Sequence, residues 1–118
     1  MRWEIRSDGG DDRQSLDAIL ELLSQYHRRA MIRYLSDAPD NVVSIDDIID
    51  HLEQIERERA GESPGEDHLL SVLVHIHGPK LEEAGLIEYD VRSRELRYYP
   101  NERVETVLER IEDVADDL

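Results

Sequence analysis

Residues 75–87 of this 118-residue chain read HIHGPKLEEAGLI, and this stretch decides the fold. Its second half, LEEAGLI at 81–87, closes a helical pattern and leads straight into an alternating one. Gly85 lets the chain reverse there, because glycine adopts the left-handed conformation that commonly ends a helix. A helix that runs directly into a β-hairpin is typical of the join between a recognition helix and a wing.

The segments on both sides of this motif support the same interpretation. Leu86–Val91 and Glu95–Tyr99 alternate as the two strands of a hairpin, with Arg92-Ser93-Arg94 as its turn. Upstream, a helix is predicted to start near Glu66, and Pro79 should kink it near His75. Its apolar positions are Leu69, Leu70, Leu73, Val74, Ile76 and Leu81.

Four further helices are predicted around this unit. Ser15 and Ser44 are N-cap candidates that open apolar stripes at 15–24 and 45–59. The other two helices are predicted at about 26–36 and 101–116, and Val42-Val43 is a candidate short strand. We therefore expect a mainly α protein with a small β-hairpin wing, a winged helix-turn-helix of five helices. Residues 1–14 would form a flexible arm, 15–100 the winged domain and 101–118 a C-terminal dimerisation helix.

Charge is the most unusual feature of the composition. The chain has 29 acidic and 14 basic residues, for a formal net charge of −15. At low ionic strength such a density of like charge destabilises the compact state, whereas molar salt shortens the Debye length to ~3 Å and screens the repulsion. The acidic residues are spread along the chain, which favours adaptation to a salt-filled cytoplasm over an ordinary acidic protein.

Composition also limits the location. No run approaches the ~18 apolar residues of a membrane helix, and the first residues lack the apolar core of a signal peptide. Cysteine is absent, so disulfides and thiolate metal sites are excluded. A cytoplasmic protein without membrane contact is expected.

The stretch 75–87 resembles the recognition helix and wing start of ArsR-like winged-helix regulators. It is closer still to small haloarchaeal winged-helix proteins whose helix carries His-x-His followed by Pro-Lys-Leu-Glu. Residues 25–35 resemble the second helix of that group, and the resemblance covers about 15–99. The chain departs from the pattern at Gly78, where leucine is usual, and in the low positive charge of its recognition helix.

The resemblance implies a transcriptional regulator that binds double-stranded DNA. Side chains that would face the groove are His68, Ser71, His75, His77 and Lys80, and those of the wing are Arg92, Arg94 and Arg97. Arg28 and Arg29 would hold the DNA backbone from the second helix. The alternative for all these arginines is that they only solubilise the surface or pair with nearby carboxylates.

The last helix has an apolar stripe that either packs on the chain's own core or pairs with a second copy. Two-fold dimers let a winged helix contact two half-sites, so we expect a homodimer through the first and fifth helices. The predicted interface residues are Leu16, Leu20, Val104, Val107, Leu108 and Ile111.

Two other functions remain open from the residues alone. The acid excess is compatible with a winged-helix module that binds proteins and not DNA. A metal- or ligand-sensing regulator is the third alternative, because His68 and His75 share a helix face. We expect no metal or cofactor and no enzyme, because the carboxylates lack a companion nucleophile, phosphate loop or metal triad.

Overall fold

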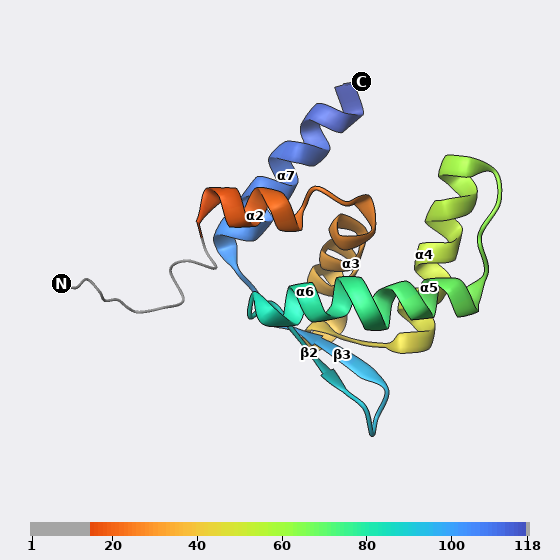
Figure 1. The fold of residues 1–118 in the computed structure, drawn as a ribbon. Coiled ribbons are helices and arrows are strands. Elements are labelled where there is room, and N and C mark those ends of the chain that lie inside the picture. The colour runs from red at the N-terminus through yellow and green to blue at the C-terminus, as the bar shows by residue number, and fades with distance from the viewer. Residues whose placement is uncertain (1–14, 118) are drawn as a thin grey trace.

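The helices and strands of the computed structural model follow the order predicted from the sequence (Figure 1). The structure describes residues 15–117, so the predicted arm at 1–14 lies outside the described residues. The elements in chain order are α2 (Leu16–Leu22), α3 (Tyr26–Asp37), the short turn η1 (Pro39–Asn41), β1 (Val42–Ser44), α4 (Ile45–Ala60), α5 (Glu66–Val72), the π-helical turn η2 (Leu73–His77), α6 (Gly78–Glu83), β2 (Ile87–Asp90), β3 (Glu95–Tyr98) and α7 (Glu102–Asp117). Because α5, η2 and α6 are continuous, they form one segment, called here the fourth helix.

Serine caps start two helices where the sequence predicts them. The Ser15 hydroxyl accepts a hydrogen bond from the Ala18 N–H at 3.1 Å, and the Ser44 hydroxyl accepts one from the Asp47 N–H at 3.0 Å. Each bond satisfies a backbone donor that has no partner within the helix. At the other end of α4, Gly61 adopts a left-handed φ of 83° and its N–H bonds to the Arg57 carbonyl.

The sheet has three antiparallel strands in the order β1-β3-β2. In the hairpin, Tyr89 lies opposite Leu96 and Glu88 lies opposite Arg97. Leu96 also lies opposite Val43 of β1, which makes β3 the central strand. The predicted hairpin and short strand are therefore present. With the helices, they make up the mainly helical winged-helix fold that the sequence predicts.

The core is almost entirely aliphatic, because the chain contains no phenylalanine. Its fully buried side chains come from every helical segment, and they include Ile19, Met31, Ile48 and Leu81. Val104 and Leu108 of α7 are also fully buried in this core, so α7 is part of the same folding unit. No helix within residues 15–117 is long and apolar enough to cross a membrane.

The fourth helix is irregular where Pro79 was expected to kink it. The Gly78 N–H bonds to the Leu73 carbonyl five residues back, which is the hydrogen bond of a π turn. A Cβ atom on Gly78 would lie only 2.7 Å from that carbonyl oxygen. The close approach explains glycine at this position, and a leucine there would be incompatible with the turn.

We predict that Gly78→Ala lowers the stability of the protein by roughly 1–3 kcal/mol, the usual cost of overpacking. In a regular helix the same change would raise the stability of the protein by ~0.5–1 kcal/mol. The sign of the stability change therefore tests the π turn. Urea unfolding in molar KCl measures it. Ser71→Ala, an exposed change on the same helix, is the control and should alter stability by less than about 0.5 kcal/mol.

Candidate nucleic-acid interface

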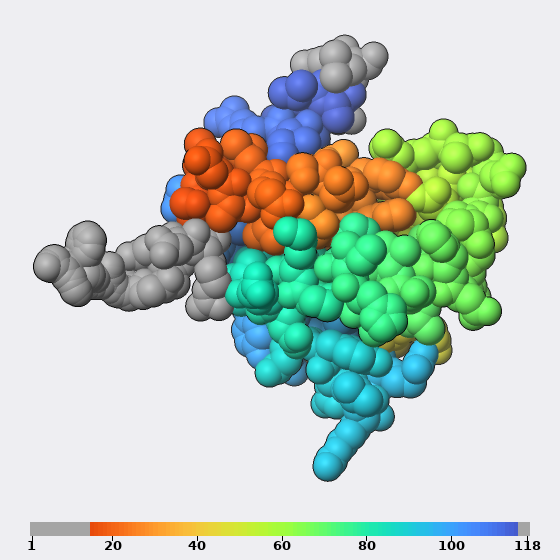
Figure 2. Space-filling view, in the orientation of Figure 1, coloured from red at the N-terminus to blue at the C-terminus, as the bar shows by residue number. Residues whose placement is uncertain are grey.

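The fourth helix and the hairpin occupy one face of the molecule. In Figure 2 the fourth helix crosses the middle of this face and the hairpin projects beneath it. Leu69, Leu73 and Leu81 are buried against the core. The side chains of His68, Ser71 and His75 are exposed on the outer side of the helix, as predicted for groove-facing residues.

The outer side of this helix is uncharged in the middle and acidic at both ends. Residues 68–79 contain no Asp, Glu, Lys or Arg. Exposed carboxylates precede this stretch at Glu66 and Asp67 and follow it at Glu82 and Glu83. The helix therefore offers histidine, hydroxyl and apolar groups over its centre, which suits contacts to base edges better than contacts to phosphates.

Lys80 is exposed, but its charge is already paired. Its Nζ donates to Oε1 of Glu21 on α2 at 2.9 Å. This hydrogen bond is the main reason that the pKa of Glu21 lies below its ordinary value. A phosphate contact by Lys80, as predicted, would have to compete with this ion pair.

The three wing arginines have different surroundings. Arg94 has a left-handed φ of 56°, and its guanidinium lies 3.4 Å from an Asp46 carboxylate oxygen at the start of α4. Arg97 lies opposite Glu88 on the outer face of the hairpin. Arg92 is exposed at the tip and forms no ion pair within the described residues.

The wing tip is held by an aspartate. One Asp90 carboxylate oxygen accepts hydrogen bonds from the Arg92 N–H at 2.9 Å and the Ser93 N–H at 3.3 Å. Such an Asx turn fixes the backbone without using the arginine side chain. Arg92 is therefore the wing cation best placed to contact another molecule.

The structure contradicts the prediction for Arg28. Its side chain is only 2% exposed, and it donates from Nε to the Leu22 carbonyl at 2.6 Å and from Nη2 to the Glu21 carbonyl at 3.0 Å. Both carbonyls lie in the last turn of α2, and that of Glu21 also accepts from the Ser24 hydroxyl at 2.7 Å. Arg28 is thus a buried helix cap that cannot reach DNA. Arg29 is half-buried and donates to the Leu23 carbonyl at 2.7 Å, so it also caps this helix end.

The prediction for His77 is also wrong, because this side chain is 6% exposed and faces the core. Nη1 of Arg28 lies 3.2 Å from its Nδ1. Since a guanidinium only donates, Nδ1 accepts and the ring proton sits on Nε2. Burial, followed by the charges of His27 and Arg28, lowers the pKa of His77 to about 4.

The neutral His77 makes stability depend on pH. Its folded pKa of about 4 lies below the ordinary histidine pKa of 6.5, so the unfolded chain gains the proton first as the pH falls. The contribution of neutral His77 to the free energy of unfolding is fully present above pH 6.5. It is lost as the pH falls towards 4, by about 3 kcal/mol in total. We predict that His77→Asn, whose amide oxygen still accepts from Arg28, removes this part of the pH dependence in urea unfolding. Identical slopes for the two proteins between pH 4 and 6.5 would contradict the assignment.

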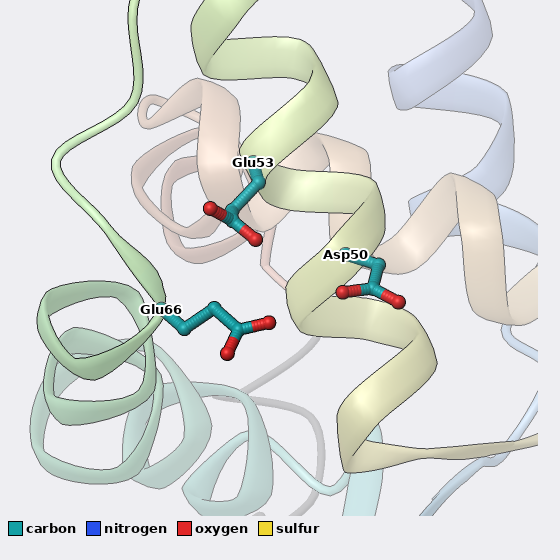
Figure 3. Close-up of side chains that lie close together, drawn as sticks. All are labelled: Asp50, Glu53 and Glu66. Atoms are coloured by element: carbon teal, nitrogen blue, oxygen red, sulfur yellow. The ribbon is translucent and has the colours of Figure 1, made fainter.

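An acidic cluster lies beside the fourth helix and was not predicted. Figure 3 shows Asp50 and Glu53 of α4 with Glu66 of α5, and one oxygen of each lies within 4.8 Å of the others. Glu53 also accepts from Arg57 at 3.2 Å and from Ser63 at 3.4 Å. The three residues come from two helices separated by a loop, so no spacing in the sequence predicts that they lie together.

Part of this cluster lines a groove of about 420 Å³ between α4, the start of α5 and the wing. Its polar wall contains Asp46, Asp50, Glu66 and Asp67, and the single cation on the wall is Arg94. Carboxylates at this density attract cations from solution. The charge of the winged face therefore depends strongly on the salt around it.

A second groove lies between α2 and α7, and it is apolar. It has a volume of about 400 Å³ and is lined by Leu20, Val107, Arg110, Ile111, Val114 and Ala115. Leu20 and Val114 are 44% and 60% exposed, and Leu16 nearby is 53% exposed. The predicted interface residues Leu16, Leu20, Val107 and Ile111 are thus accessible. Val104 and Leu108 are not, because they are buried in the chain's own core, and their prediction as interface residues is wrong.

A family model described as "Domain of unknown function (DUF7344)" matches residues 20–97, which run from α2 to the last strand of the hairpin. No curated protein matches this chain. No solved structure matches it either.

Proposed function

The chain belongs to this family, and we propose that it is a DNA-binding regulator whose fourth helix and wing contact a duplex in concentrated salt. The observation that carries the proposal is the exposed side of residues 68–79, which has no charged side chain. In a chain with a net charge of −15, this stretch lies along the one helix that a winged helix-turn-helix inserts into the major groove.

The proposed contacts follow from exposure and pairing. His68, Ser71 and His75 would donate to or accept from base edges. Arg92 at the wing tip would enter the minor groove or reach the backbone, as an unpaired cation can. Because acidic residues outnumber basic ones by 29 to 14, affinity would rest on hydrogen bonds and shape, and counterion release would contribute little.

The test starts from a random-sequence duplex library selected on the native protein in molar KCl. We expect an enriched sequence, and we expect Arg92→Ala combined with Arg94→Ala to weaken binding to it by about tenfold or more. Arg57→Ala is the matched control, because Arg57 is exposed on the distant end of α4 and pairs only with Glu53 there. Equal affinity for the wing variant and the control would contradict the wing assignment.

A module that binds a protein is the second candidate. It is favoured by the carboxylates at both ends of the fourth helix and by the pairing of Lys80 with Glu21. Selection of no sequence, together with no binding to the library at any salt concentration, would support this candidate over DNA binding.

We also propose that two copies associate through the α2–α7 groove. Leu20 and Val114 line the groove and are exposed, and Leu16, one turn earlier on α2, is exposed as well. Arg110 lines the same groove and Asp17 is exposed on α2, so a two-fold arrangement can pair opposite charges at the rim. Such a dimer would present two fourth helices to one duplex.

We predict that Leu20→Asp and Val114→Asp each convert the protein from dimer to monomer, because each buries a carboxylate in an apolar contact. Sedimentation equilibrium in molar KCl measures the mass. Val91→Asp provides the control, since Val91 is 71% exposed on the wing tip and lies outside the groove. A wild-type protein that sediments as a monomer, or groove variants that remain dimeric, would contradict the proposed interface.

A further inference from the structure

The end of α2 is joined to the π turn of the fourth helix by a group of four polar side chains. Arg28 binds the last carbonyls of α2, at Glu21 and Leu22, and its Nη1 donates to Nδ1 of His77 in η2. One buried guanidinium therefore links α2, α3 and η2. Its removal would take one donor away from each of these three acceptors.

The Glu21 carboxylate forms a second link between the same two elements. Oε1 accepts from Nζ of Lys80 in α6 at 2.9 Å, and Oε2 lies 3.6 Å from Nη2 of Arg28. The two attachment points on the fourth helix, His77 and Lys80, lie on either side of Gly78-Pro79. Both links thus act on the part of the helix where the hydrogen-bond pattern changes from π to α.

The same α2 helix borders the apolar α2–α7 groove on its other side. Leu20 lines that groove, and the next residue along the helix is Glu21. α2 therefore contacts both the groove and the middle of the fourth helix. π turns occur frequently at functional sites, which suits a point where one helix acts on another.

We propose that Glu21, Arg28, His77 and Lys80 are positioning residues that set the placement of the fourth helix relative to α2. The inference deepens the proposed function, on which its meaning for DNA binding rests. Arg28 and His77 are buried and cannot contact DNA themselves. Together with Glu21 and Lys80, they fix the exposed side of residues 68–79 in the orientation that a duplex would meet, and they carry any displacement of α2 to it.

Amide hydrogen exchange on the full chain tests the link without DNA. In His77→Leu, which removes the acceptor for Arg28, exchange at residues 73–81 should rise roughly tenfold, and rates in α4 and β3 should change far less. His77→Asn keeps an acceptor and should restore rates near those of the native chain. If His77→Leu does not fold, Lys80→Met should raise exchange at the same residues about threefold, and Lys80→Arg should not.

Glu112→Gln is the matched control. Glu112 binds Arg33 through both carboxylate oxygens and so joins α3 to α7, which is also an ion pair between helices. Its loss should lower global stability without a specific effect at residues 73–81. A uniform rise in exchange over all helices in His77→Leu or Lys80→Met, or no rise at 73–81, would overturn the proposal.

DNA affinity gives the functional readout. At matched losses of stability, His77→Leu, at a side chain too buried to contact DNA, should weaken binding to the selected duplex severalfold, and Glu112→Gln should not. If the native protein binds no DNA, the proposed function fails, and the exchange pattern still decides the positioning role. If the native protein binds DNA and both variants bind equally, the positioning role is contradicted and the proposed function stands.

Discussion

The fourth helix is held against the core by one residue at every fourth position, Leu69, Leu73, His77 and Leu81. A regular α-helix would turn this stripe by about 40° at each step, because it has 3.6 residues per turn. The π turn at 73–77 holds more residues per turn and corrects the drift, so all four side chains remain buried. This placement decides which side of the fourth helix is exposed. It also decides where the chain turns at Gly85 into the hairpin, and where the helix is attached to α2.

The burial of His77 in that stripe is possible because Arg28 reaches it from α3. A buried polar ring requires a partner, and a buried guanidinium requires several. Arg28 donates one hydrogen bond to His77 and two more to the carbonyls that end α2. The polar centre of the core is therefore also the junction between three helices, and the charges of the acidic surface lie outside it.

Periodicity and caps predicted the architecture well, since these signals depend on residues close together in the chain. Ser15, Ser44 and the LEEAGLI motif predicted the helix starts and the helix–hairpin join correctly.

Arg28 and His77 were misplaced, because residue type alone assigns Arg and His to the surface and cannot reveal partners 49 positions apart. Val104 and Leu108 show the same limit, since an apolar stripe does not distinguish the chain's own core from an interface with a second copy. The Asp50–Glu53–Glu66 cluster depends on how α4 and α5 meet, which no local pattern contains.

The central claim is that an acidic winged helix binds DNA through an uncharged helix face once salt screens its carboxylates. The most direct test is the affinity of the native protein for its selected duplex from tenth-molar to molar KCl, over which the Debye length falls from ~10 Å to ~3 Å. We expect affinity to rise over this range, because repulsion between carboxylates and phosphates is screened and cations fill the groove near Arg94. A fall in affinity by orders of magnitude, as found for proteins that bind DNA by neutralising phosphates, would contradict it.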